Sequence, residues 1–240
     1  MKRKIYFLFT IFFVSCGIPQ FVYLEEPTMH TLANLFTCHA VFLNSTKNDP
    51  DHFFGFDLYY QLYPTEEQLK SVTKQINGTT INGRNYLKRK GYHKLFIADN
   101  SGTTPDTQIK SHGYTIPIKN NKRKPLEISI DFIDDQVENL QKFNSYVLVE
   151  YITEKIYICR NPMQNRVNKN DTDYLVKSFA PDNFSIHDSD IVKGKPERDR
   201  LYMALYVCAV GYNKNYVPIY SEPTYLGKCE FLIDEGVFND

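Results

Sequence analysis

The stretch Phe54-Gly55-Phe56-Asp57-Leu58-Tyr59-Tyr60-Gln61-Leu62-Tyr63 decides the fold class of this chain, because its side chains alternate between two kinds. Every second residue from Phe56 to Leu62 is large and mainly apolar, and these residues alternate with Asp57, Tyr59, Gln61 and Tyr63. Successive side chains of a strand point to opposite faces of its sheet. The alternation therefore predicts a strand with one face on a core and one wetter face.

Residues 201–210 form a second decisive segment, which is apolar at nearly every position. Such a run is typical of a central strand that is covered on both faces, and residues 217–226 are its expected partner. Period-two patterns predict several further strands, and we expect them at residues 35–43, 92–98, 114–118, 126–132, 146–152 and 155–159.

Helical patterns are few. Thr65 is a suitable N-cap with Gln68 three residues later, which is the capping-box spacing. Apolar residues then recur at helical spacing, which predicts a helix over residues 66–76. A second short helix is expected at 134–143. Many short strands with one or two short helices indicate a mainly β chain that forms an antiparallel β-sandwich.

The N-terminus has the pattern of an export signal. Three basic residues follow Met1, and residues 5–14 carry no charge. This uncharged run is shorter than the roughly 20 residues that a membrane-spanning helix needs, so we expect residues 1–15 to be a signal peptide. Residues 16–30, which contain two prolines, are the expected tether, and residues 31–240 the expected β-sandwich region.

Phe13-Val14-Ser15-Cys16 resembles the lipobox of bacterial lipoproteins, although Phe13 stands where that motif most often has Leu. The resemblance implies that Cys16 becomes the lipidated first residue of an exported protein held in the inner or outer membrane. Together with the prolines of the tether and the strand 55–60, it makes the chain similar to lipoproteins of spirochaetes. A plain secreted protein is the alternative.

Two stretches resemble strands of a fibronectin type III domain, a fold of the immunoglobulin-like class. Residues 55–60 resemble its third strand. Residues 202–211 and the turn at 220–223 resemble its last two strands. The two stretches lie far apart, so the resemblance implies either two modules, at about 31–140 and 141–240, or one sandwich with a long insertion.

Four cysteines remain after Cys16, and export would permit disulfides among them. Cys208 with Cys229 is the favoured pair because both lie in one strand-rich region, and buried free thiols are the alternative. No paired Cys-x-x-Cys spacing occurs, so we expect no metal and no cofactor. Positive and negative charges balance at 28 each, which gives no reason to expect a nucleic-acid partner.

No catalytic arrangement is evident. The chain has no Gly-x-Ser-x-Gly elbow. His187 next to Asp188 is read as a solvated loop pair, since adjacent residues in a strand point apart. The acidic pairs at 66–67 and 134–135 lie at expected helix starts, where they complement the helix dipole. We therefore expect a protein that is not an enzyme.

Tyrosines supply the candidate binding surface, because tyrosine is a preferred contact residue at interfaces. Tyr59 and Tyr63 are expected on the wetter face of their strand, and Tyr212, Tyr216 and Tyr220 at the last turn. This predicts a binding, adhesion or structural module with an unknown protein or glycan partner. The alternative function is a secreted carrier that holds a small apolar ligand in a β-lined cavity.

Overall fold

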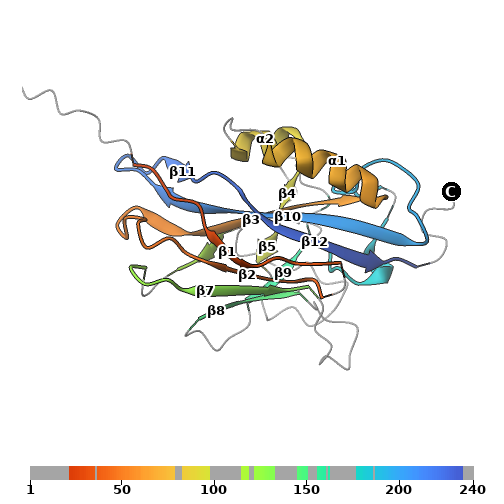
Figure 1. Cartoon of the computed structure of the whole chain (residues 1–240), viewed down its shortest axis with the longest axis horizontal. Helices are drawn as coiled ribbons and strands as arrows, with labels where there is room; N and C mark the ends of the chain where they lie inside the picture. The colour runs from red at the N-terminus through yellow and green to blue at the C-terminus, as the bar shows by residue number, and fades with distance from the viewer. Residues whose placement is uncertain are drawn as a thin grey trace, which may run out of the picture.

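A computed structural model of the chain describes residues 22–35, 37–78, 83–97, 115–118, 122–132, 145–150, 156–160, 162, 177–185 and 187–234. It is mainly β and built from antiparallel sheets, which confirms the expected fold class at that level (Figure 1). The signal segment, Cys16 and the expected helix at 134–143 lie outside the described residues. Within the described part, no helix is long and apolar enough to cross a membrane.

In the described part of the chain, twelve strands form two sheets. The first sheet contains, in spatial order, β1 (Thr28–Thr31), β2 (His39–Leu43), β7 (Glu127–Asp131), β8 (Tyr146–Val149), β9 (Ile156–Cys159) and β5 (Phe96–Ile97). The second contains β11 (Pro218–Tyr220), β10 (Arg200–Tyr212), β3 (Phe53–Tyr63) and β4 (His93–Lys94), with β12 (Thr224–Leu232) paired to β10 and β6 (Thr115–Pro117) paired to β3. The helices are α1 (Glu66–Asn77), α2 (Gly83–Arg89) and the 3-10 turn Pro181–Asn183.

The main core lies between the two sheets. Alternate apolar residues of β3 and β10 face those of β2, β7 and β8. The Phe42 and Phe56 rings, one from each sheet, meet edge to face with centroids 5.0 Å apart, a favoured aromatic geometry. The apolar face predicted for residues 56–62 is confirmed, since all four of its large side chains are buried in this core.

The other face of β3 is also buried, because α1 and α2 lie across the second sheet (Figure 1). Tyr59 and Tyr63 are 0% and 1% exposed. Burial leaves tyrosine hydroxyls in need of partners, and the Tyr63 hydroxyl is hydrogen-bonded to Gln61 Oε1 at 2.8 Å and to the Tyr92 hydroxyl at 3.1 Å. The expectation of a wetter face is wrong: this face is a second, tyrosine-rich core.

The helix α1 matches its prediction. Thr65 has an extended backbone, and its hydroxyl accepts a hydrogen bond from the Gln68 backbone N–H at 3.2 Å, as an N-cap should. The buried residues Leu69 and Ile76 then recur on the side that packs on the sheet. The sequence pattern did not indicate α2, which begins at Gly83.

The two sheets are joined at both edges. At one edge, β4 pairs with β3 of the second sheet, and β5, one residue later, pairs with β9 of the first. At the other edge, Ala33 forms a bridge to Gly227 of β12. The Ala33 N–H donates to Leu226 O at 2.8 Å, and the Lys228 N–H donates to Ala33 O at 3.2 Å. The chain between β1 and β2 is thereby tied to the second sheet.

Two expected boundaries are wrong. β3 and β10 pair from Phe53–Gly211 to Tyr63–Tyr202, so strands from both halves of the chain share one sheet and do not form modules at 31–140 and 141–240. The segment 22–30 is also part of the domain rather than a tether. Leu24 is 1% exposed in the main core, and β1 pairs with β2.

Candidate binding surface

The hairpin between β10 and β11 holds an aromatic side chain out in solvent. Asn213 organises its loop: the Asn213 side-chain oxygen accepts from the N–H groups of Asn215 and Val217 at 2.9 and 3.0 Å. Tyr216 has a φ of 57° and is 87% exposed. A positive φ is uncommon for a bulky residue and costs free energy. The loop therefore maintains an unfavourable backbone conformation at an aromatic residue that makes little contact with the domain.

Three more exposed apolar residues lie at the same end of the second sheet. Phe54, at the start of β3, meets Tyr212, at the end of β10, with ring centroids 5.9 Å apart. These two residues are 41% and 39% exposed, and Val217 in the loop is 53% exposed. We call Phe54, Tyr212, Tyr216 and Val217 the hairpin surface. It is a set of apolar side chains at the tip of the domain.

The first described residues lie at this same end (Figure 1). Leu24 packs near Gly211, one residue before Tyr212. The Glu25 N–H donates to the Asn48 side chain at 2.7 Å, which fixes the entering chain beside the loop that precedes β3. Tyr23 is exposed there as well. The N-terminal segment thus enters the domain next to the hairpin surface.

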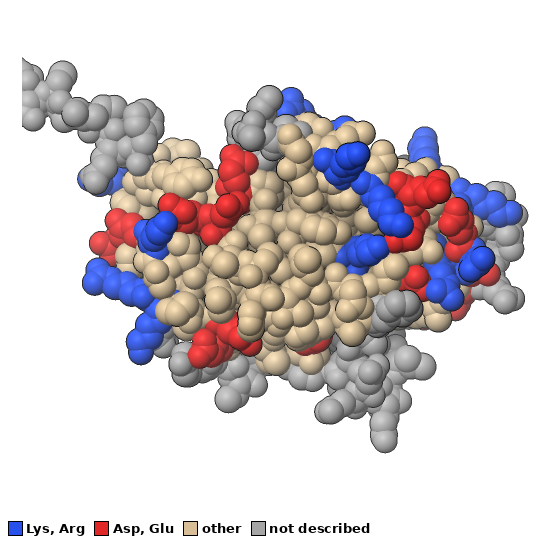
Figure 2. Space-filling model, viewed as in Figure 1, with Lys and Arg blue, Asp and Glu red and all other residues tan. Residues whose placement is uncertain are grey.

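Charges of both signs surround a largely uncharged face. Figure 2 shows this face across the middle of the molecule, with acidic and basic side chains gathered toward its two ends. Such mixed charge gives no single-sign field to attract a polyanion or a polycation. The charge distribution therefore gives no reason to expect a polyionic partner at either end.

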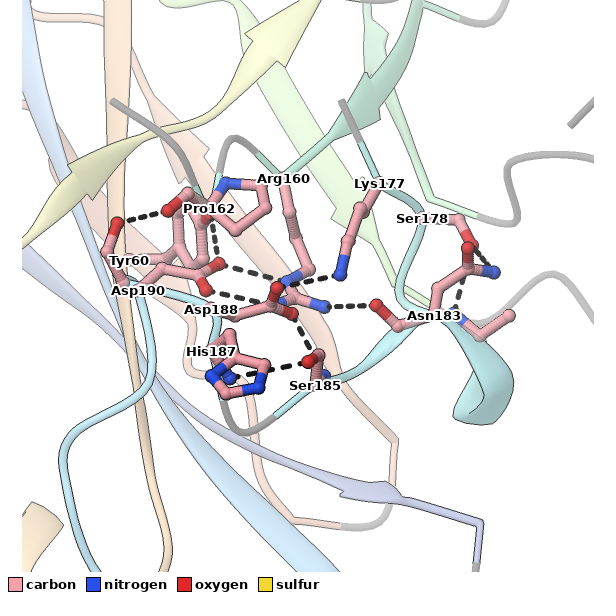
Figure 3. Close-up of polar contacts among 12 residues, drawn as sticks. Tyr60, Arg160, Pro162, Lys177, Ser178, Asn183, Ser185, His187, Asp188 and Asp190 are labelled. Atoms are coloured by element: carbon pink, nitrogen blue, oxygen red, sulfur yellow. Dashed lines mark hydrogen bonds and ion pairs between the residues drawn. The ribbon is translucent and has the colours of Figure 1, made fainter. Parts of the chain in front are cut away.

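A buried ionic cluster contacts β3 through Tyr60, on the face of β3 that lines the main core (Figure 3). Arg160, at the end of β9, is fully buried. The Arg160 Nε and Nη2 atoms donate to the two Asp190 oxygens at 3.0 and 2.9 Å, and Nη2 also donates to Asp188 at 2.8 Å. Lys177 Nζ reaches Asp188 at 2.7 Å, and the Tyr60 hydroxyl donates to Asp190 at 2.5 Å. Two cations thus balance two carboxylates.

The cluster joins segments of the chain to one another, and each of its carboxylates is already engaged by cations or hydrogen-bond donors. Burial alone would raise the pKa of Asp190, but the adjacent Arg160 guanidinium and the Tyr60 hydroxyl outweigh it and lower that pKa. The Arg160 guanidinium also lies over the Phe184 ring, 4.3 Å from its centroid. Beside the cluster, the Leu62 N–H donates to Asp190 O at 3.0 Å. The loop that carries Asp188 and Asp190 is therefore attached to β3.

The interpretation of His187 and Asp188 as a solvated pair is wrong for Asp188. Asp188 is buried and turned toward Arg160, while His187 is exposed (Figure 3). Their side chains do not form an acid–base dyad, since the Asp188 oxygens are engaged by Arg160, Lys177 and the Ser185 N–H. No sequence signal connects Arg160 with two aspartates about thirty residues later.

Of the predicted tyrosine surface, Tyr212 and Tyr216 are exposed, whereas Tyr59 and Tyr63 are buried and do not belong to it. Tyr220 is half-buried, and the Arg84 guanidinium carbon lies 3.5 Å from the centroid of its ring. Phe54 and Val217 were not predicted. Phe54 looks like an ordinary strand residue, and only its position beside Tyr212 makes it part of a surface.

The favoured disulfide between Cys208 and Cys229 is contradicted. All four described cysteines are free thiols, and it is the placement of Cys208 and Cys229 in different cores that rules out this pair. Cys208 belongs to the tyrosine-rich core under the helices, and Cys229 to the core between the sheets. The body of the second sheet separates them. Proximity in sequence does not show which face of a sheet a residue occupies.

Comparisons with protein-family models, curated proteins and solved structures found no match. Among the residues that the structure describes, there is no group of three or more His, Cys, Asp or Glu placed to hold a metal ion. Function is therefore inferred from the sequence and the geometry of this chain.

Proposed function

We propose that this chain is an exported lipoprotein, anchored through Cys16, whose β domain is a binding module and not a catalyst. The observation that carries the binding role is Tyr216, an aromatic residue held 87% exposed at a positive φ by the Asn213 turn. Backbone strain that persists at an exposed aromatic residue is a reason to infer function. Phe54, Tyr212 and Val217 extend the contact area.

We also propose that the sheets form a fibronectin type III-like, immunoglobulin-class sandwich with a long insertion. The pairing of β12, β10, β3 and β4 supports this, because the last strand, β10, the third strand and the strand after it lie side by side, as corresponding strands do in that class. The short strand β11 lies between β10 and β12 in the chain and also pairs with β10. The two stretches that resemble this family are neighbours in the second sheet. The insertion between β3 and β4 contains α1 and α2.

The anchor gives the hairpin surface an orientation. From Cys16 to Val22, the first described residue, the chain advances by six positions (22 − 16). At about 3.5 Å per position this segment spans at most ~21 Å. Anchoring through Cys16 would thus keep the hairpin end close to the membrane. Its partner is a protein or glycan at the membrane surface, recognised by stiff amphipathic tyrosines.

The carrier alternative has less support. The space between the sheets is filled by packed rings: Phe179 stacks on Phe231 with centroids 5.0 Å apart, and Phe132 meets Phe179 edge to face at 5.2 Å. A ligand cavity lined by these residues would require them to separate, which would lose contacts in a close-packed core.

Lipidation predicts a specific labelling result. Cells that make the chain and are fed an alkyne-tagged palmitate should attach label to the wild-type protein and none to Cys16→Ala, because the acyl chains need that thiol. Cys208→Ala is the control and should keep its label, since this thiol is buried in the domain. Equal labelling of the Cys16→Ala variant, or no labelling of the wild type, would remove the anchor from the proposal.

The hairpin surface predicts site-specific cross-linking. A photo-reactive phenylalanine analogue at position 216 should give adducts in cells, and the same analogue at Lys193 should give few. Lys193 is exposed beside Gly194, which packs on Pro64 at the opposite end of β3. Loss of the adduct mass on treatment with protease or with glycosidase would assign the partner to protein or to glycan.

Tyr216→Gly supplies the matching loss of function. Excess wild-type domain should compete for the partner and suppress those adducts, whereas excess Tyr216→Gly domain should not. The substitution should change the free energy of unfolding by no more than about 0.5 kcal/mol, since glycine accepts a positive φ. Thermal unfolding would check the second point. Adducts at position 193 as abundant as those at 216, or full competition by Tyr216→Gly, would count against the surface.

A further inference from the structure

The thiols of Cys38 and Cys229 lie next to each other between the two sheets. Cys38 immediately precedes β2, and Cys229 lies in β12. Both are 0% exposed and belong to the main core. Cys38 Sγ lies 3.8 Å from the backbone oxygen of Glu230, the residue after Cys229. The two cysteines are 191 positions apart in the sequence (229 − 38) and meet only in the fold.

The thiols interact directly, and the interaction makes them unequal. The hydrogen bond with Cys229 lowers the pKa of Cys38, against the opposing effect of burial. Burial, followed by the same hydrogen bond, raises the pKa of Cys229 well above its usual value. The shared hydrogen bond places the two thiols in contact within the folded domain.

Backbone geometry also singles out Cys38. Its φ of 47° lies in the left-handed region, which residues with a side chain seldom adopt. The conformation is held by a hydrogen bond from the Cys38 N–H to Asn34 O at 3.1 Å, and by one from the Phe132 N–H to Cys38 O at 3.4 Å. This conformation places Sγ against β12. The adjacent Ala33–Gly227 bridge brings the same two segments together.

The remaining described cysteines have other neighbours. Cys159 Sγ donates to Phe96 O at 3.8 Å, and Cys208 faces the helices on the far side of the second sheet. Among the described cysteines, Cys38 and Cys229 are the pair whose thiols hydrogen-bond to each other.

We propose that Cys38 and Cys229 become a disulfide that joins the two sheets when the chain folds outside the cytoplasm. The bond stabilises the domain by restricting the unfolded chain over a very long loop. The inference rests on the proposed export, because cytosolic thiols are kept reduced. It replaces the pairing of Cys208 with Cys229.

The oxidant is a protein or small-molecule disulfide of the exporting compartment. One cysteine of the pair, as a thiolate, attacks one sulfur of this oxidant, forms a mixed disulfide and releases the other sulfur as a thiolate, which takes up a proton. The thiolate of the other cysteine then attacks the sulfur of the first and releases the second thiol of the oxidant. Two thiols of the chain lose two protons and two electrons, and the oxidant gains them. Because both sulfurs end up buried, this exchange precedes the final packing of the core.

The decisive experiment uses purified Cys16→Ala chain, which removes the unrelated thiol. It is refolded with a mixture of oxidised and reduced glutathione, and its peptides are mapped without reduction. We expect a linked pair of peptides that contains Cys38 and Cys229, and a mass loss of about 2 Da for the two hydrogens. Reduction should lower Tm by an amount on the order of 10 °C. Further substitution of Cys208→Ala should change neither the linked peptides nor this shift.

Two results would overturn the inference. One is free thiols at both Cys38 and Cys229 after oxidative refolding, and the other is a linked peptide that contains Cys159 or Cys208 instead. Cys229→Ala is the variant that removes the bond, because serine at position 38 would put a hydroxyl into the apolar core and destabilise the fold by itself. The Cys229→Ala protein should fold without the disulfide, and reduction should leave its Tm unchanged.

Trapping thiols with a maleimide in living cells separates this inference from the proposed export. A disulfide that forms in vitro and is also found in cells supports both. One that forms in vitro but is absent in cells contradicts the bond in the native protein and points to failed export as the cause. Absence in vitro contradicts the geometric argument, whatever the location of the chain.

Discussion

Replacing Arg160 with methionine is expected to lower the free energy of unfolding by about 3–5 kcal/mol, the usual cost of breaking a fully buried ion pair from one side. The substitution keeps much of the side-chain volume but leaves Asp190, which is 0% exposed, and Asp188 with fewer positive partners. Chemical denaturation would measure the loss. Arg123→Met, at an exposed arginine, is the matched control and should change stability by no more than about 0.5 kcal/mol.

A double substitution tests whether the cluster acts as one unit. Arg160→Met combined with Asp190→Asn should cost less than the sum of the two single losses, because groups in one ionic network are coupled. Additive losses would show that Arg160 and Asp190 stabilise the domain independently. That result would contradict the arrangement in Figure 3, in which Asp190 accepts two bonds from Arg160.

The same cluster predicts how stability falls in acid. The folded-state pKa of Asp190 lies below its ordinary value of 3.8, so below that pH the unfolded chain binds more protons than the folded one. The contribution of Asp190 is therefore present above pH 3.8 and lost as the pH falls through its lower folded-state pKa. Denaturation curves at a series of acidic pH values should fall more steeply for wild type than for Asp190→Asn. Parallel curves would contradict this assignment.

Gly227→Ala is expected to lower the free energy of unfolding by roughly 2–4 kcal/mol. Gly227 has a φ of 115°, and an added Cβ would lie 2.3 Å from the Ala33 backbone oxygen, which is too close for any real contact. The bridge between the sheets at this edge would have to open. Thermal or chemical unfolding would measure the effect.

Gly78→Ala is the control for that substitution. Gly78, after the end of α1, has an ordinary φ of −88°, and its added Cβ would approach no atom closer than Lys74 O at 3.2 Å. We expect this variant to lose less than about 1 kcal/mol. A Gly227→Ala protein as stable as Gly78→Ala would show that Ala33 and Gly227 are not in contact in solution.

The elements that local patterns predicted are those in which neighbours in sequence share an environment. β3 was predicted almost to the residue, since alternation from Phe56 to Leu62 needs only a strand with one buried face. α1 was predicted because Thr65 caps its own helix and apolar residues repeat at its turn spacing. The signal pattern and Cys16 also came from local sequence, and they stay predictions.

The identity of what covers each face was not predictable from those patterns. Tyrosine suits a half-exposed strand and a buried layer alike, because it is apolar along its ring and polar at its hydroxyl. The packing of α1 and α2 on the second sheet decided that Tyr59 and Tyr63 are buried. Only Tyr212 and Tyr216, at the open end of that sheet, kept the exposure expected of a binding surface.

The sequence by itself determined a mainly β chain, its central strands, its first helix and a candidate lipid anchor, since each depends on spacing within a short segment. Only the tertiary structure decided that Arg160 meets Asp190, that Cys38 meets Cys229, and that Phe54 joins the hairpin surface. Such pairs depend on the register and order of strands that are distant in sequence. Register and order follow from packing of the whole domain, which no local period encodes.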